Sequence, residues 1–504
     1  MLRPSVVTLL VSLAAAVPAR ADRCSDVLAR IGPLLAGATC TTTTDLTTNG
    51  ATTTPADNSI PGFPLRAITP QTDRSVISPK FADKTPIMHA VPGVQIDGQL
   101  ATDSTGQARF LLRLPDDWNG KLVVAGASGT RSEFNGDWAW SDYVVQKGYA
   151  YASQNKGVLN LVLIGCLTAD NCHPVVQFTP PDDLACRLNP ASPLWVHFFD
   201  NAADKPFSQW QFRMVEAAAI ARVGVHAAYG RHPRRTYAVG TSNGGYQVRR
   251  AVELAPFLFD GGVDWEGTFV DGETPNLLSD LPPAIQNFPA YKAAGYDAGS
   301  AAALTIRAAG YPPDIVRPGA GPNRTTLSLW EQYYNQFWEV TQCQWQKRLD
   351  PGYDTYGSGT GTYDYFARAA AHPEIEANID AFETTGKIKV PLITVAGTMD
   401  GLLPIQHHAR AYAAKVDASR KGNNDHRAAQ YRLYEVQNGN HIETYRDIFP
   451  QLEYIQPHAQ AAFDLLVKHV EENQPLPPSQ CIPHSGSIAQ SPAQAGHCAQ
   501  LFVP

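Results

Sequence analysis

The chain has few charges for its length, and it lacks long basic or apolar runs. Only 17% of its 504 residues are charged, the formal net charge is −7, and no run of Lys and Arg is longer than a pair. Nucleic acids and anionic membrane surfaces attract basic patches, so this balance predicts neither as a partner. The hydrophobic content of 44% is that of an ordinary globular protein with a large core.

Patterns of known metal and cofactor sites are missing as well. No Cys-x-x-Cys pair occurs, and the spacing of cysteine and histidine is not that of a zinc site. Cys166, Cys172 and His173 stand close together, but a disulfide loop is the better interpretation there. We therefore predict neither a metal nor a cofactor.

The first 21 residues have the pattern of a secretory signal peptide. Arg3 gives a positive start, residues 6–17 are apolar but too short to span a bilayer, and Ala19-Arg20-Ala21 fits a cleavage site. A buried N-terminal helix is the alternative. No later stretch holds about 18 uninterrupted apolar residues, so we expect no membrane-spanning helix. The predicted destination is the periplasm or the outside of the cell.

Eight cysteines, an even number, agree with an oxidising destination. Their close spacing along the chain suggests the pairs Cys24–Cys40 and Cys481–Cys498, each tying down a terminal segment. Eight cysteines allow about 105 pairings, so the full connectivity stays open.

Strand-like and helical runs alternate in two parts of the chain. The expected strands lie near residues 94–96, 108–114, 121–126, 149–153, 237–240, 261–264, 390–397 and 431–436, with helices at 207–229 and 245–254. This alternation predicts an α/β fold with a mostly parallel sheet flanked by helices. Between about residues 266 and 385 it stops, and aromatic residues are dense from Trp330 to Phe366. We interpret this part as an inserted, aromatic-rich cap or lid.

These patterns divide the chain into six predicted segments. Residues 41–44 and 52–54 are threonine runs, which we interpret as part of an exposed connector. The segments are a signal peptide (1–21), a Thr-rich N-terminal extension (22–84), the first part of the core (85–265), the cap (266–385), the second part of the core (386–475) and a C-terminal tail (476–504) tied by a disulfide.

A nucleophile motif stands near the middle of the chain. The strand-like run ends in Gly240-Thr241-Ser242-Asn243-Gly244, a Gly-x-Ser-x-Gly pattern that leads into a predicted helix. A strand, a sharp turn and a helix are the context of a nucleophile elbow, in which the serine hydroxyl is exposed above the sheet. The flanking glycines keep the tight turn free of Cβ clashes. We predict Ser242 as a nucleophile.

A serine nucleophile needs a histidine base and a carboxylate that orients it. Asp400 follows a predicted strand in a Gly/Pro loop, and His441 follows the next strand on an Asn/Gly loop. The chain order serine, acid, histidine is that of the nucleophile-elbow fold. Asp264, after the strand that follows the elbow, is the competing acid. His407 and His408 are interpreted as surface residues.

Developing negative charge on the substrate needs two N–H donors. Asn243, directly after the nucleophile, should supply one of them. The other should come from the small-residue loop 126–130 after an early strand, with Ala127 or Ser128 as the candidates.

With these residues in place, the chain resembles α/β-hydrolase-fold serine esterases. It is similar to 3-hydroxybutyrate oligomer hydrolases and to the tannase and feruloyl esterase group. The similarity covers about residues 105–270, with looser matches around the acid and the histidine. Its motifs are Trp118-Asn119-Gly120-Lys121, the loop 126–129, the segment 147–157, Ser242-Asn243-Gly244-Gly245 and Phe259-Asp260-Gly261-Gly262-Val263. The resemblance implies hydrolysis of carboxylic esters.

One departure separates the chain from tannases. Members of that group usually carry one Cys just before the nucleophile and another just after the catalytic His, joined as a disulfide. Here Thr241 and Ile442 occupy these positions. The departure weakens the likeness to tannases and removes the reason to expect their calcium-bearing lid, while Ser-Asn-Gly-Gly favours the oligomer hydrolases.

The substrate is predicted only in outline. Trp265, Glu266 and Trp338 are the candidates for a pocket wall that would suit a bulky acyl or alcohol group. The aromatic residues could equally pack the cap against the core. The leading hypothesis is hydrolysis of short 3-hydroxybutyrate-type oligomers, and aromatic esters are the alternative. A silent binding protein of the same fold and an acyltransferase are the rivals, and the oligomeric state stays open.

Overall fold

The computed structural model describes residues 20–50, 85–129, 132–158, 161–165, 185–192, 194–198, 207–353, 363–421 and 430–504. Residues 1–19 of the predicted signal peptide lie outside this part, and so do the threonines at 52–54, Cys166, Cys172 and His173. In the part of the chain that is described, no helix is long and apolar enough to cross a membrane.

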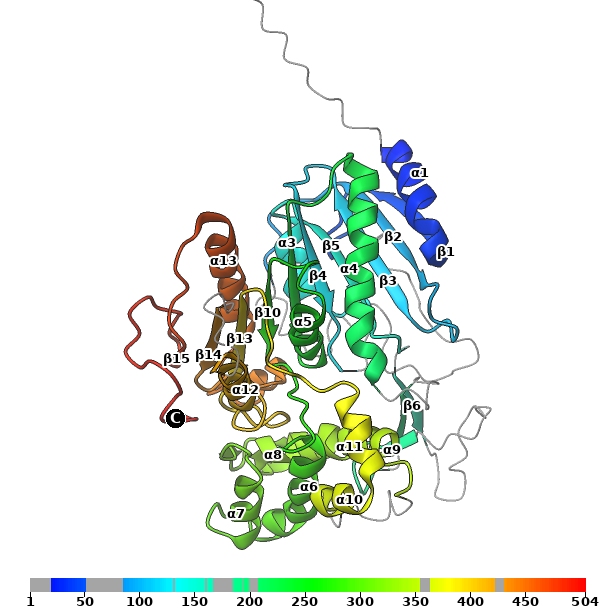
Figure 1. The fold of residues 1–504 in the computed structure, drawn as a ribbon. Helices are drawn as coiled ribbons and strands as arrows, with labels where there is room; N and C mark the ends of the chain where they lie inside the picture. Colours follow the sequence, from blue (N-terminus) through cyan, green and yellow to red (C-terminus); the bar gives the residue numbers. More distant parts are fainter. Residues whose placement is uncertain are drawn as a thin grey trace, which may run out of the picture.

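A ten-stranded sheet runs through the middle of the molecule (Figure 1). Strands β1, β2 and β3 pair antiparallel, and β3 pairs antiparallel with β5; from β5 onward all neighbours are parallel. In spatial order the strands are β1 (Leu35–Thr43), β2 (Gly93–Leu100), β3 (Arg109–Pro115), β5 (Ala150–Gln154), β4 (Lys121–Gly126), β9 (Arg235–Thr241), β10 (Gly261–Trp265), β13 (Leu392–Gly397), β14 (Tyr431–Val436) and β15 (Gln480–Ile482).

Helices cover both faces of this sheet. Alternate strand residues point to opposite faces, so Leu122 and Val124 of β4 belong to one apolar cluster, while Val123 and Ala125 belong to another. The first cluster includes helices α1 (Arg20–Ile31), α4 (Ser208–Tyr229), α5 (Asn243–Leu254) and α12 (Ala409–Lys421). The second includes α3 (Asp142–Val145) and α13 (Gln456–Glu472). The predicted α/β-hydrolase fold, a mostly parallel sheet between helices, is confirmed.

A group of helices gathers below one end of the sheet (Figure 1). They are α6 (Leu277–Ala293), α7 (Ala301–Ala308), α8 (Leu329–Tyr333), α9 (Glu339–Leu349), α10 (Tyr365–Ala371) and α11 (Pro373–Asp380). Trp330, Trp338 and Trp345 are buried in a third apolar cluster that also contains Met399 and Leu402 from the loop after β13. These rings therefore pack the helical insertion against the sheet. The exact domain boundaries stay a prediction.

Two small sheets complete the described structure. One joins β6 (Leu161–Gly165), β8 (Leu194–Phe198) and β7 (Ala185–Arg187), and the other joins β11 (Val316–Arg317) with β12 (Leu327–Ser328).

The N-terminal threonines differ from the prediction. Residues 35–43 form the edge strand β1, paired with β2, and not a connector, although most of the strand is exposed or half-buried. Threonine is β-branched and favours strands, and the Cys24–Cys40 disulfide ties β1 to α1. The predicted pair Cys481–Cys498 is also confirmed.

A third disulfide was not predicted. It joins Cys186 of β7 to Cys343 of α9, across 157 residues of sequence. No local spacing points to such a pair.

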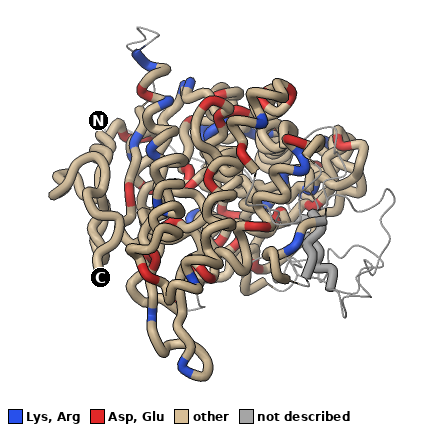
Figure 2. Tube along the Cα trace, turned by 90° about the horizontal axis from the view of Figure 1, so that it is seen from below, with Lys and Arg blue, Asp and Glu red and all other residues tan. Residues whose placement is uncertain are grey.

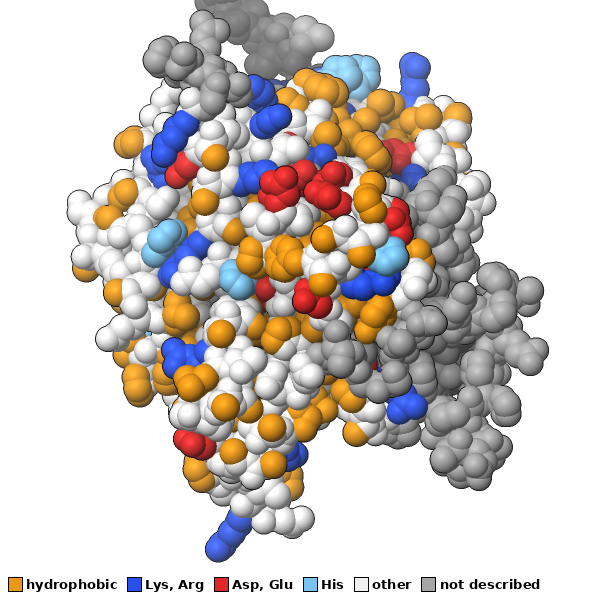
Figure 3. All heavy atoms as spheres, turned by 60° about the horizontal axis from the view of Figure 1, so that its bottom comes forward, with side chains coloured by type: hydrophobic (Ala, Val, Ile, Leu, Met, Phe, Trp, Pro, Cys, Tyr) orange, Lys and Arg blue, Asp and Glu red, His pale blue; other side chains and the backbone are white. Residues whose placement is uncertain are grey.

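Charged residues of both signs occur throughout the described part of the chain (Figures 2 and 3). Basic and acidic residues are interspersed along the trace (Figure 2). The face near the helical insertion carries apolar side chains scattered among polar ones (Figure 3). This distribution agrees with the low net charge.

Candidate active site

Ser242 stands in a strained turn between β9 and α5. Its backbone angles are φ 58° and ψ −122°, a region that non-glycine residues rarely occupy. The turn depends on close backbone packing: a Cβ on Gly240 would lie 2.3 Å from the Gly244 carbonyl oxygen, and one on Gly244 would lie 2.4 Å from that of Gly126. Only glycine fits at both positions.

The Ser242 hydroxyl faces a histidine and, behind it, a carboxylate. His441 Nε2 lies 3.0 Å from Ser242 Oγ, and His441 Nδ1 lies 2.8 Å from Asp400 Oδ2. The three residues are 7%, 6% and 2% exposed. They follow β9, β14 and β13, whose carboxyl ends meet at one edge of the parallel sheet. The structure thus brings together the three residues predicted as nucleophile, base and acid.

Asp400 is held rigidly by its own loop. Its Oδ1 accepts hydrogen bonds from the backbone N–H groups of Leu402 and Leu403, both at 2.7 Å. Trp338, a predicted pocket residue, is fully buried and donates its indole N–H to the Gly401 carbonyl at 2.7 Å. In this structure Trp338 fixes the loop that carries Asp400.

The competing acid Asp264 is committed elsewhere. It is buried, its Oδ2 pairs with Arg249 Nε at 2.6 Å, and the same oxygen accepts from the Thr394 hydroxyl at 2.8 Å. Its Oδ1 accepts from the Gly267 N–H at 2.7 Å. These bonds favour Asp400 over Asp264 as the partner of His441.

Glu266 lies against the site from the end of β10. Its Oε1 is 3.7 Å from His441 Nδ1, and the side chain is 3% exposed. Burial raises the pKa of this carboxyl well above its usual value, and the nearby charges of Asp400 and Glu443 raise it further. The sequence placed Glu266 and Trp265 in a pocket wall. Trp265 is also buried, at 4% exposure.

Two of the three predicted oxyanion donors, Ala127 and Ser128, already have partners in this structure. The Ala127 N–H donates to Gln247 Oε1 at 3.1 Å, and the Ser128 N–H donates to Asn135 Oδ1 at 3.0 Å. Asn243 is the first residue of α5, where backbone N–H groups have no partner inside the helix. The Asn243 N–H is therefore the stronger candidate for an oxyanion donor.

A buried lysine that sequence reasoning missed supports the same loop. Lys156 Nζ donates to the carbonyl oxygens of Ala127 at 2.8 Å and Ser128 at 3.1 Å. Lys156 is fully buried and has a positive φ of 64°. The sequence signal that could have identified Lys156 was its position after β5, in the segment 147–157 that carries part of the family resemblance.

The histidines beside Asp400 are not both surface residues, contrary to the prediction. His408 is 2% exposed, and its Nδ1 accepts from the Phe269 N–H at 3.0 Å. His407 Nδ1 lies 2.9 Å from Asp280 of α6. The expected exposure failed because α6 covers this turn.

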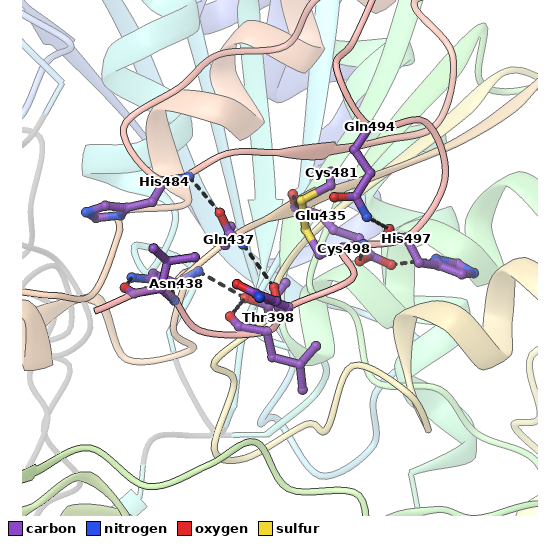
Figure 4. Close-up of a disulfide and its surroundings, with 12 residues drawn as sticks. Thr398, Glu435, Gln437, Asn438, Cys481, His484, Gln494, His497 and Cys498 are labelled. Atoms are coloured by element: carbon purple, nitrogen blue, oxygen red, sulfur yellow. Dashed lines mark hydrogen bonds and ion pairs between the residues drawn. A yellow bond between two sulfur atoms is a disulfide. The ribbon is translucent and has the colours of Figure 1, made fainter.

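The C-terminal tail forms hydrogen bonds with the loops that carry Asp400 and His441 (Figure 4). The Thr398 hydroxyl donates to the Leu501 carbonyl and accepts from the Asn438 N–H at 2.9 Å. Asn438 Nδ2 donates to the Val503 carbonyl at 2.6 Å, and its Oδ1 accepts from the Val503 N–H at 2.8 Å. Cys481–Cys498 anchors the start of this tail.

Among the residues that the structure describes, one group of side chains has donor atoms close enough to bind a single metal ion. Glu266, Asp400 and His441 each offer an atom, and these atoms lie within 4.8 Å of one another. Because Asp400 and His441 already bond each other, the arrangement suits proton transfer at the Ser242 hydroxyl.

Comparison with known families gives a partial match. Residues 339–503 match the family model described as 3HB-oligomer hydrolase. This segment contains Asp400 and His441 but not Ser242, and it covers less than half of the chain. The resemblance to 3-hydroxybutyrate oligomer hydrolases is confirmed, although the sequence motifs had placed it mainly at 105–270.

Relatives of known function match over a short length. The chain is 33% identical over 129 residues to D-(-)-3-hydroxybutyrate oligomer hydrolase of Burkholderia thailandensis, which is 24% of this chain and 17% of the relative. A protein of the same description from Burkholderia pseudomallei is 33% identical over 135 residues, 25% of this chain and 18% of the relative. The match thus spans less than a fifth of each relative.

Solved structures with similar architecture include two fungal enzymes. Tannin acyl hydrolase from Aspergillus niger has a TM-score of 0.45 at 13% identity, covering 91% of this chain and 89% of the other. Feruloyl esterase B from Aspergillus oryzae has a TM-score of 0.42 at 13% identity, covering 78% and 84%.

Proposed function

We propose that this chain is a serine hydrolase of carboxylic esters. The observation that carries the proposal is the hydrogen-bonded series from Ser242 through His441 to Asp400, with distances of 3.0 and 2.8 Å. This series is the arrangement that activates a hydroxyl as a nucleophile. The strained turn at Ser242 and the glycines around it support the same role.

The chemistry follows from the atoms present. His441 Nε2 removes the proton of the Ser242 hydroxyl as Oγ attacks the ester carbonyl carbon. Asp400 stabilises the resulting imidazolium through Nδ1. The Asn243 N–H receives the charge on the carbonyl oxygen. A second donor from the loop, Ala127 or Ser128, would first have to release its present acceptor, Gln247 or Asn135. His441 then protonates the leaving alcohol, and water repeats the cycle on the acyl-enzyme.

Short polyester oligomers of the 3-hydroxybutyrate type are the proposed substrates. Support comes from the family match over 339–503 and from the Burkholderia 3-hydroxybutyrate oligomer hydrolases that are 33% identical to part of this chain. In such a reaction both the acyl group and the leaving alcohol are hydroxy-acid units. Each cleavage therefore releases one carboxylate and one hydroxyl.

We also propose that the protein works outside the cytoplasm. Three disulfides among the described residues support this location, because disulfides persist in oxidising compartments.

A substrate panel tests the proposal. Purified protein is incubated with 3-hydroxybutyrate dimer and trimer, a p-nitrophenyl acyl ester, and feruloyl and galloyl esters. We expect the oligomers to have the highest kcat/KM. S242A should lose turnover of every ester, while the exposed-serine control S104A should retain it. Turnover by S242A equal to that of S104A would exclude the proposed mechanism, and preference for a galloyl or feruloyl ester would exclude the proposed substrate.

A further inference from the structure

Glu266 occupies a special place among the strands that carry the candidate site. It directly follows β10, which lies between β9, the strand before Ser242, and β13, the strand before Asp400. Its φ is 45°, and its N–H donates to the Val395 carbonyl at 2.7 Å. Glutamate rarely takes such a backbone conformation without a structural or functional reason.

The carboxyl of Glu266 is buried without the donors that a carboxylate needs. Neither of its oxygens has a hydrogen-bond partner among the described residues, and the side chain is 3% exposed. Asp400, by contrast, accepts bonds from Leu402, Leu403 and His441. A buried charge without donors is costly. The donors that face Asp400 favour a negative charge there, whereas the surroundings of Glu266 favour the neutral carboxyl.

The groups facing Glu266 agree with a neutral carboxyl. They are Asp400, Glu443, Asp264, the Tyr333 phenol and His441, and the Trp265 indole lies beside them. Burial, Asp400 and Glu443 raise the pKa of Glu266, and only Trp265 among the principal contributors opposes them. Arg249, the cation on the neighbouring helix α5, is already paired with Asp264.

We propose that Glu266 is a positioning residue for His441, a second acid that becomes the carboxylate partner of Nδ1 when Asp400 is neutralised. The proposal rests on the proposed function. Its Oε1 needs to move only about 1 Å to shorten the 3.7 Å separation to a hydrogen bond. The proton of Glu266 goes to solvent as it ionises, and His441 Nδ1–H then donates to Oε1. A merely structural glutamate would not support turnover after the loss of Asp400.

Kinetics in a D400N background separate these two roles. We measure kcat and KM of wild type, D400N, D400N/E266Q and D400N/E266D with a p-nitrophenyl ester across pH. The rate with S242A is subtracted as the uncatalysed rate. D400N should retain a residual kcat that rises with pH as Glu266 ionises. The fall in kcat from wild type to D400N should be smaller than the roughly 10⁴-fold fall expected for a triad without a second acid.

The double variant D400N/E266Q should be at least about tenfold slower than D400N and should lack the rising limb. D400N/E266D, which keeps the charge but shortens its reach, should fall between them. Identical kcat and pH profiles for D400N and both double variants would overturn the proposal.

An infrared measurement gives a result that does not depend on turnover. The difference spectrum between wild type and E266Q at neutral pH should contain the C=O stretch of a protonated carboxyl. A carboxylate band in its place would overturn the neutral state of Glu266. An inactive wild type would contradict the proposed function, and the infrared spectrum alone would then decide the state of this carboxyl.

Discussion

The Thr398 hydroxyl accepts a hydrogen bond from the Asn438 N–H at 2.9 Å, and this bond joins the loop that carries Asp400 to the loop that carries His441. The same hydroxyl donates to the Leu501 carbonyl of the C-terminal tail. Thr398 thus connects three segments that are far apart in sequence. In tannases a disulfide beside the serine and the histidine is expected to fix this geometry, whereas here Thr241 and Ile442 occupy those positions.

Replacing Thr398 with valine should loosen both loops. T398V keeps the shape of the side chain but leaves the buried Asn438 N–H and the Leu501 carbonyl without their partner. The expected cost is about 1–3 kcal/mol of unfolding free energy, with a lower kcat. Thermal unfolding and ester turnover measure these effects. The control T305V, on the exposed face of α7, should change neither the unfolding free energy nor kcat. A wild-type kcat in T398V would show that Thr398 does not position the two loops.

Two disulfides of nearly equal loop length allow a matched comparison. Cys24–Cys40 closes a separation of 16 residues, and Cys481–Cys498 closes one of 17. Loop-closure entropy predicts that each double serine variant loses about 3 kcal/mol of stability. Only C481S/C498S releases the tail that contacts Thr398 and Asn438, so only this variant should also lose kcat while still folded. Equal kcat values in the two variants would refute the positioning role of the tail.

The tail should also respond to acid through Glu435. Burial alone would raise the pKa of this carboxyl, but hydrogen bonds from His497 and Arg410 outweigh it and hold the pKa below its usual value of 4.5. A lowered pKa gives stability that is present above 4.5 and is lost as the pH falls through the folded-state value.

Melting temperature measured against pH checks this dependence. The wild type should lose stability in that acid range, because protonated Glu435 no longer pairs with Arg410, whose Nη2 lies 2.7 Å from Oε2. E435Q should be less stable at neutral pH and should show a smaller loss on acidification. A loss of equal size in E435Q would assign the acid response to other groups.

The turn at Ser242 should not tolerate a side chain on Gly244. In G244A the added Cβ would lie 2.4 Å from the Gly126 carbonyl oxygen, so β4 and α5 would have to separate. We expect about 1–3 kcal/mol of destabilisation and a strong loss of kcat. G32A, whose Cβ would have no neighbour within 4 Å, is the control and should behave as wild type. Equal behaviour of the two variants would contradict the packing described for this turn.

Much of the fold follows from local sequence patterns. The strands around Ser242, Asp400 and His441 were predictable because buried strands, turn residues and helical periods are short-range signals. The chain order of the three residues then fixed which loops should meet. The disulfides Cys24–Cys40 and Cys481–Cys498 were predictable from their short spacing.

Contacts between distant segments could not be predicted in this way. Cys186–Cys343 joins residues 157 positions apart, and no local pattern selects that pair. The position of Glu266 beside His441, with φ 45°, could not be predicted, because sequence shows only that it follows a strand. The partners of the Ala127 and Ser128 N–H groups, Gln247 and Asn135, likewise depend on tertiary packing.

Active-site labelling tests whether Ser242 is the nucleophile. The folded wild type is treated with a fluorophosphonate, and the modified residue is identified by peptide mass spectrometry. We expect one covalent adduct, on Ser242, that is lost in S242A, slowed in H441A, and slowed when a 3-hydroxybutyrate oligomer is present. An unlabelled Ser242 in folded protein, or an adduct on another serine that persists in S242A, would contradict this expectation.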